Sequence, residues 1–188
     1  MAESTPFRLG QPRYRRLNII KSFYVKFERK IPALINDFCC YYSWHRNKTV
    51  VFYFDATALS SNYAVNDQDF RWWVIHEFER HGWRVESVYL SNPMPHDEKY
   101  LHINQAFAGK HRLVPFFNRS NNEDLILAIQ SAGVSRVRNG FHKDKSGEKL
   151  AESEVIDEVA CVARTLLEHR TDGSDAFDTL YIGCEKFP

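Results

Sequence analysis

Residues 49–58 read TVVFYFDATA, and this stretch decides the fold class that the sequence predicts. Every residue from Val50 to Phe54 is β-branched or aromatic, which predicts a strand over Thr49–Asp55 that is buried on both faces. Asp55 ends the apolar run, and a buried carboxylate without a partner is strongly unfavourable or takes up a proton. We therefore expect Asp55 to lie where the strand meets solvent, or to have a cationic partner such as Arg, Lys or a metal ion.

Helical and strand patterns alternate on both sides of this strand. The alternation predicts an α/β domain with a partly parallel sheet, and functional groups gather at the carboxyl ends of such strands. Asp55 stands at such an end. The other expected strands are 23–27, 84–90 and 112–117, and the expected helices are 32–44, a helix capped by Asn66 or Asp67 that runs to Arg80, 97–108, 123–132, 153–169 and a last helix from Ser174.

The distribution of charge and the cysteines limit the domain organisation, the binding partners and the cellular compartment that the sequence allows. Residues 1–22 are polar and basic, which predicts a flexible arm before one domain over residues 23–188. Residues 1–30 hold eight Lys or Arg against two acids, whereas residues 151–188 hold three against nine. This split suits a protein that touches phosphate and holds cations, although a solvated surface explains it more simply. No apolar run reaches the roughly 18 residues of a membrane span, and the cysteines indicate reduced thiols in a cytosol-like compartment.

Two further acids stand near the C-terminus, in the stretch RTDGSDAFDTLYIG at 170–183. Ser174 can cap a helix that starts at Asp175, and Asp178 then lies on the same helix face. Acids in a first helical turn can simply favour the helix dipole, by ~0.3–1 kcal/mol each. Together with Asp55, the same acids can instead hold two Mg²⁺ or Mn²⁺ ions, which prefer oxygen ligands and support phosphodiester cleavage.

Other common catalytic and metal-binding motifs are absent from the sequence. It contains no phosphate-binding G-x-x-x-x-G-K-[ST] loop, no H-E-x-x-H or paired C-x-x-C for zinc, and no G-x-S-x-G hydrolase motif. The eight histidines are scattered along the chain. We expect His76, His81 and His102 to be surface or packing residues on helices.

The order of these features resembles the nuclease domain of a phage terminase large subunit. The resemblance covers residues 23–187, and its sharpest parts are FYFDATA and DGSDAFDTLYIG. It implies a ribonuclease-H-like mixed sheet with flanking helices. Asp55 matches the acid after the first strand, and Asp175 and Asp178 match the late acidic pattern. These three acids are then the expected catalytic metal ligands.

The chain departs from this family at two points. The family carries a middle acid near the second strand, where this chain has Ser91, Asn92 and Pro93. Asp97 and Glu98 are the nearest acids, and we prefer Glu98 as the fourth catalytic ligand because its side chain is longer. The ATPase motor of a full terminase large subunit is also missing, so the chain is a separately made nuclease or a fragment.

The resemblance implies a metal-dependent endonuclease that cuts concatemeric viral DNA during genome packaging, using two Mg²⁺ or Mn²⁺ ions. Its implied partners are double-stranded DNA, a terminase ATPase domain or subunit, the small terminase subunit and the portal, with no membrane. Its implied location is the cytoplasm of an infected or prophage-carrying bacterial host.

A basic stretch at 136–149 predicts a hairpin that contacts DNA phosphates, although a solvated loop is the plainer interpretation. Its candidate DNA-binding residues are Arg136, Arg138, Lys143, Lys145 and Lys149. Two alternatives to the packaging nuclease stay open. One is another ribonuclease-H-like nuclease, such as a junction resolvase. The other is a non-catalytic DNA-binding or assembly module on the same fold, which the missing acid after Leu90 supports.

Overall fold

The structure is a computed structural model and describes residues 14–25, 31–59, 69–92, 94–137, 140–143 and 173–187. The chain divides into two compact units. One is Phe23–Pro93, here called the β2–β3 unit. The other combines Met1–Ser22 with Met94–Pro188 and is called the β1–β4 unit. The chain therefore starts in the β1–β4 unit, leaves it for the whole of the β2–β3 unit, and then returns.

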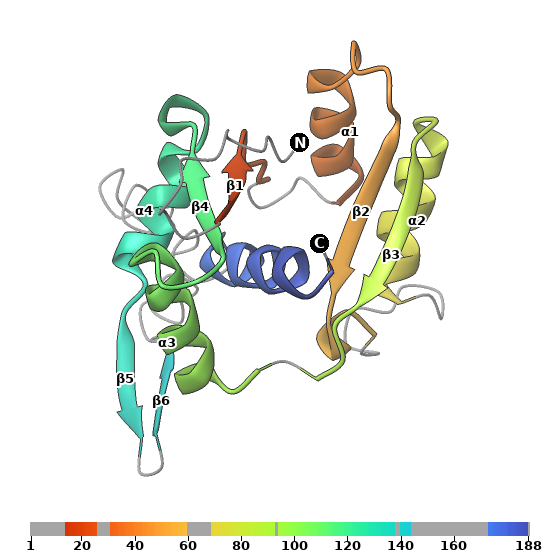
Figure 1. Ribbon diagram of the computed structural model, residues 1–188. Helices are drawn as coiled ribbons and strands as arrows, with labels where there is room; N and C mark the ends of the chain where they lie inside the picture. The colour runs from red at the N-terminus through yellow and green to blue at the C-terminus, as the bar shows by residue number, and fades with distance from the viewer. Residues whose placement is uncertain are drawn as a thin grey trace, which may run out of the picture. The chain divides into compact units, whose positions relative to one another are not determined.

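Two parallel strands form the sheet of the β2–β3 unit, as Figure 1 shows. Strand β2 (Thr49–Phe54) pairs with β3 (Arg84–Tyr89), and Phe54 lies opposite Tyr89. The carboxyl ends of both strands therefore meet at the same edge, where the short 3-10 helix η1 (Ala56–Leu59) begins. Helix α1 (Ile31–Tyr41) and helix α2 (Phe70–Arg80) belong to the same unit. The expected strand–helix–strand order over residues 49–90 is confirmed, whereas Phe23–Val25, the described part of the strand expected at 23–27, is not in a strand.

The core of the β2–β3 unit is built from α1, α2 and Trp83, the residue before β3. Ile35, Cys39, Val74 and Trp83 are buried together. The ring of Phe38 joins this core, with its centroid 5.3 Å from the centroid of Trp83. Helix α2 is capped by Asp69, whose Oδ1 accepts a hydrogen bond from Trp72 N at 2.7 Å. The observed cap thus lies beyond the expected Asn66 or Asp67, both of which fall outside the described residues.

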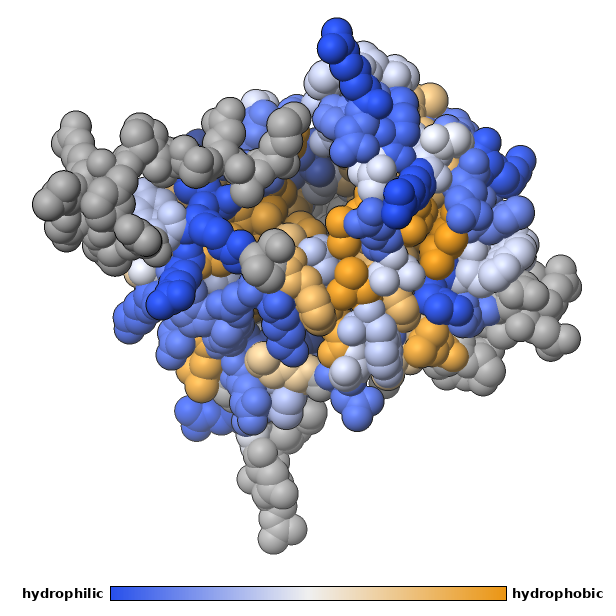
Figure 2. Space-filling model, turned by 45° about the vertical axis from the view of Figure 1, so that its right-hand side comes forward, coloured by the Kyte–Doolittle hydropathy of each residue, from blue (hydrophilic) through white to orange (hydrophobic). Residues whose placement is uncertain are grey.

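The expectation that β2 is buried on both faces is wrong. Phe54 is 6% exposed, but Val51 is 48% exposed, and Tyr89 on the neighbouring strand is 46% exposed. The apolar run makes a good strand, yet in the described residues β2 has a strand partner on one side, β3. Figure 2 shows apolar side chains, in orange, at the surface among polar ones in blue.

The β1–β4 unit contains a second parallel pair, in which β1 (Arg15–Ile19) lies beside β4 (Leu113–Phe117). Strand β1 falls inside the stretch that was expected to be a flexible arm, because Leu17 and Ile19 alternate with polar residues and pack on the core. Residues 1–13 are outside the described part. The remaining elements of the unit are α3 (His96–Phe107), η3 (Arg119–Asn121), α4 (Glu123–Ser131), the antiparallel hairpin β5 (Val134–Val137) and β6 (Gly140–Lys143), and a C-terminal helix over residues 173–186.

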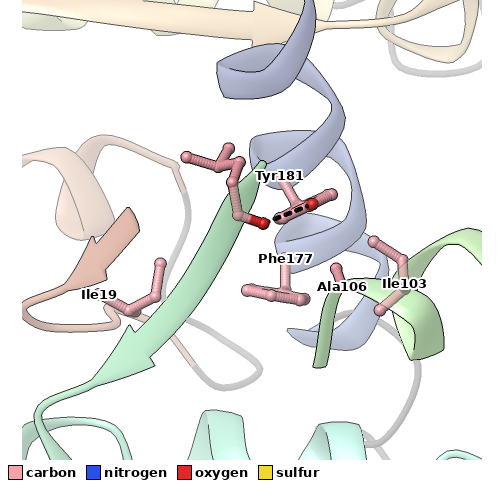
Figure 3. Close-up of a cluster of buried hydrophobic side chains, with 6 residues drawn as sticks. Ile19, Ile103, Ala106, Phe177 and Tyr181 are labelled. Carbon is pink, nitrogen blue, oxygen red and sulfur yellow. Dashed lines mark hydrogen bonds between the residues drawn. The ribbon is translucent and has the colours of Figure 1, made fainter. Parts of the chain in front are cut away.

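The C-terminal helix is anchored in the core of the β1–β4 unit. Figure 3 shows Phe177 and Tyr181 of this helix among the side chains of β1, α3 and β4. Tyr181 is fully buried, and its hydroxyl donates a hydrogen bond to the Leu113 carbonyl at 2.8 Å. The equally well buried Asn122 donates to the Ile19 carbonyl at 3.0 Å. These bonds fix the start of α4 and the C-terminal helix relative to β1 and β4.

The described residues confirm the α/β class. They contain the β1–β4 and β2–β3 parallel pairs, the β5–β6 hairpin and five α-helices. The helix expected over residues 153–169 lies outside the described residues. None of the helices in the described ranges combines the length and the apolar composition that a membrane span requires.

Candidate carboxylate site

Asp175 and Asp178 converge on a single cation, the ammonium group of Lys143. Both acids lie in the C-terminal helix, three residues apart, and so share a face. Lys143 stands at the end of β6, and its Nζ lies 2.6 Å from Asp175 Oδ1 and 2.8 Å from Asp178 Oδ2. The same Nζ donates to Ser174 Oγ at 2.8 Å. Two carboxylates and a hydroxyl thus surround one positive charge.

Asp178 is the most deeply buried of the predicted ligands. Its side chain is 8% exposed, compared with 34% for Asp175 and 14% for Lys143. Burial raises the pKa of Asp178, while Lys143 and the buried Lys99 of α3 act in the opposite direction. The nearby charge of Asp175 adds to the rise. Asp178 therefore depends on neighbouring cations to stay ionised, because little water reaches it.

Asp55 lies directly after β2 in the other unit, and its carboxylate bonds a residue in its own turn. Its Oδ1 accepts hydrogen bonds from Thr57 N at 2.9 Å and from Thr57 Oγ1 at 2.5 Å. The carboxylate is half-buried and holds the start of η1. A short polar side chain that bonds the backbone two residues on is a common way to make such a turn. This answers why an acid follows the apolar run, and it leaves the metal role of Asp55 as a prediction.

The backbone beside Asp55 is strained. Ser91 follows β3 with φ of 69°, in the left-handed region that non-glycine residues seldom adopt. Its carbonyl accepts a hydrogen bond from Ala56 N at 3.3 Å, so Ser91 lies next to Asp55 at the carboxyl edge of the parallel pair. Strained residues of this kind are found preferentially at functional sites.

The two candidates for the middle acid differ in their surroundings. Asp97 and Glu98 both stand in the first turn of α3, within the β1–β4 unit. Glu98 is exposed, whereas Asp97 is half-buried against β6. A methyl group at Gly140 would lie 3.7 Å from Asp97 Oδ2. Asp97 therefore faces the strand that carries Lys143, while Glu98, the preferred candidate on side-chain length, is open to solvent.

The basic hairpin is present, but its lysine has acidic partners. Arg136 is exposed on β5. Lys143 pairs with Asp175 and Asp178, which sequence reasoning had placed in a different part of the site. Its proposed contact with DNA stays a prediction. Arg138, Lys145 and Lys149 lie outside the described residues.

A second group of side chains escaped the sequence analysis. His102, His111 and Glu185 place one ligand atom each within 4.8 Å of one another, all in the β1–β4 unit. His102 had been expected to be a surface or packing residue. The three residues come from α3, the loop before β4 and the C-terminal helix, so no sequence spacing marks them as a group.

The donors around Lys143 suit a hard divalent ion, because carboxylate and hydroxyl oxygens are the ligands that Mg²⁺ and Mn²⁺ prefer. No protein-family model, curated protein or solved structure matches this chain.

Proposed function

We propose that this chain is a metal-dependent DNA endonuclease with a ribonuclease-H-like fold. The observation that carries the proposal is the convergence of Asp175 and the buried Asp178 on one cation. Burying the carboxylate of Asp178 beside that of Asp175 opposes folding unless a positive charge compensates. Such an arrangement is expected where a protein must hold cations.

Asp55, Asp175 and Asp178 are the proposed ligands, with Asp97 or Glu98 as a fourth. The two ions would activate a water molecule and stabilise the leaving oxygen of a phosphodiester. Lys143 Nζ bonds both carboxylates, so an ion that binds them would have to displace it from at least one. Phosphate oxygens of DNA are natural acceptors for the ammonium group released in this way. Arg136 would contact the DNA backbone from the same hairpin.

The order of the elements supports this function. Parallel strands whose carboxyl edge carries Asp55, followed by alternating helices and strands and a late acidic helix, follow the order of a terminase nuclease domain. On this proposal the substrate is concatemeric viral DNA in the cytoplasm of the bacterial host. The ATPase, the small terminase subunit and the portal are the partners.

A non-catalytic DNA-binding or assembly module is the second candidate. The pairing of Lys143 with both acids favours it, because an ammonium group can satisfy these carboxylates permanently without a metal ion. In that case the acids stabilise the hairpin and do not cut DNA.

Cleavage of supercoiled plasmid with Mg²⁺, Mn²⁺ or EDTA separates the two candidates. A nuclease nicks the plasmid with either ion and stops in EDTA, and Asp55→Asn and Asp178→Asn abolish nicking while the fold is kept. Asp124→Asn is the matched control, since Asp124 is an exposed acid in the first turn of α4 and should cut at the wild-type rate. Wild-type cutting by both site variants would refute the proposed site. DNA binding without cleavage under any metal would establish the second candidate.

The fourth ligand is identified by Asp97→Asn and Glu98→Gln at saturating Mn²⁺. Loss of nicking in only one of the two variants identifies the fourth ligand. Full activity in both shows that the site works with three carboxylates.

A further inference from the structure

His102, His111 and Glu185 form a compact cluster at the edge of the β1–β4 core. His102 Nε2 lies 2.6 Å from Glu185 Oε2, and His111 Nδ1 lies 3.0 Å from Glu185 Oε1. The two imidazole rings cross nearly edge to face, with centroids 4.3 Å apart. One carboxylate therefore faces a nitrogen of each ring.

The hydrogen bonds around His111 leave a place for a cation. Its Nε2 lies 3.3 Å from Gln105 Oε1, and in the tautomer whose Nε2–H donates to this oxygen, Nδ1 has a lone pair. Nδ1 faces Glu185 Oε1 and, at 3.3 Å, the hydroxyl oxygen of Tyr181. That hydroxyl already donates its hydrogen to Leu113. In that tautomer three acceptor atoms meet, and a bound cation would satisfy all three.

We propose that this cluster binds one transition-metal ion of the Zn²⁺ class. Two imidazoles and one carboxylate are a known zinc ligand set, and nitrogen ligands select against Mg²⁺. Zinc bonds of about 2.0–2.2 Å place ligand atoms roughly 3.3 Å apart in a tetrahedral site, so small side-chain shifts suffice. The bond from His111 Nε2 to Gln105 orients the ring in the way that the partner of a metal-ligating histidine does.

The cluster is open enough to receive an ion and close enough to the core to fix structure. The side chains of His102, His111 and Glu185 are 25%, 13% and 30% exposed. The neighbouring residues Ile103 and Leu113 belong to the buried core, and Tyr181 lies one helical turn before Glu185. A bound ion would tie the C-terminal helix to α3 and to the loop before β4. Solvent would complete its coordination.

The test is Zn²⁺ titration of the full chain after removal of metals with a chelator. Isothermal calorimetry should show one Zn²⁺ site of micromolar affinity or tighter. An ion in hundredfold excess over its dissociation constant should raise the melting temperature by roughly 5–10 °C. His102→Gln and His111→Gln should each weaken binding by at least about 100-fold. His76→Gln is the matched control, because His76 is an exposed histidine in the other unit.

Co²⁺ provides a readout that does not depend on the variants folding. Co²⁺ in this site should show the visible absorption of a low-coordinate nitrogen and oxygen site, without the near-ultraviolet charge-transfer band of a thiolate ligand. A thiolate band, or no Zn²⁺ binding by the wild-type chain, would overturn the proposal. Unchanged binding in both histidine variants would do the same.

This site is independent of the proposed nuclease site. Asp178→Asn should leave Zn²⁺ affinity unchanged, and His111→Gln should leave Mn²⁺-dependent cleavage intact wherever the variant is folded. A failed cleavage assay therefore does not bear on zinc binding, and a failed zinc titration does not bear on cleavage.

Discussion

Asp55 and Asp178 were predicted for the same role, yet their surroundings are opposites. Asp55 accepts two hydrogen bonds from Thr57, two positions away in the sequence. Asp178 is buried and bonds the ammonium group of Lys143, 35 positions away. One carboxylate is satisfied by its own turn, whereas the other needs a charge delivered by a different element. A carboxylate such as Asp55 can therefore change its partner with little loss of stability. A buried carboxylate such as Asp178 cannot.

The largest expected effect follows from removing that delivered charge. Lys143→Met should destabilise the β1–β4 unit by about 3 kcal/mol, because it leaves Asp178 buried with fewer cations around it. Urea unfolding measures the change. Lys110→Met is the control, since Lys110 is exposed in the same unit and its loss should change stability by less than about 0.5 kcal/mol.

A double variant sharpens this result. Lys143→Met with Asp178→Asn should recover much of the lost stability, because the uncompensated charge is gone. Mn²⁺ should raise the melting temperature of Lys143→Met more than that of the wild type if these acids form a metal site. Additive losses in the double variant would show that the pair is not coupled.

The pH dependence of stability should report the same burial. Because burial raises the pKa of Asp178 above its ordinary value of 3.8, the folded chain holds this proton more firmly than the unfolded chain. The contribution of Asp178 to stability therefore decreases as pH rises from 3.8 through the folded pKa, and is constant above it. The stability of Asp178→Asn relative to wild type should increase across this window. A gap that stays constant between pH 3.5 and 7, roughly, would contradict the direction of the shift.

Asp55 should respond more weakly. Asp55→Ala removes both bonds to Thr57 and should destabilise the β2–β3 unit by about 1 kcal/mol, as for other capping residues. Asp55→Asn keeps an acceptor oxygen and should stay within about 0.5 kcal/mol of wild type. Thermal unfolding of the two variants checks this order. Equal losses would mean that the charge of Asp55, and not its acceptor oxygen, holds the turn.

The smallest expected effect is at Ser91, the strained neighbour of Asp55. Ser91→Gly should stabilise the β2–β3 unit by up to about 1 kcal/mol, because glycine adopts a φ of 69° without steric strain. Unfolding in urea measures this gain. A loss of stability would instead point to a contribution from the Ser91 side chain.

Much of the local structure could be predicted from the sequence. The strand over 49–54 is confirmed from its apolar run. Asp175 and Asp178 lie in a helix, as the spacing of the apolar residues predicts, but Gly173 and Ser174 are already helical, so Ser174 is not its N-cap. Strand β1 was missed, because its five residues carry two arginines and an asparagine, and its pairing with β4 depends on a distant partner.

The partners of the candidate site could not be predicted in the same way. Lys143 was assigned to DNA because it is a lysine in a basic stretch, and sequence carries no signal that β6 brings it to Asp178. The cluster of His102, His111 and Glu185 could not be predicted for the same reason, because its members meet only when three elements pack. Side chains that act within one turn can be predicted from spacing, and those that meet across elements require the fold.

The route of the chain through the two units has a consequence for folding order. Strand β1 is made early, but the bond that joins Ile19 to Asn122 spans 103 positions. During synthesis the whole β2–β3 unit is made before β4, and its own contacts are nearer in sequence. We expect the inserted unit to fold first, while β1 is still unpaired. The pairing of β1 with β4 is then the slow, late step that completes the β1–β4 unit.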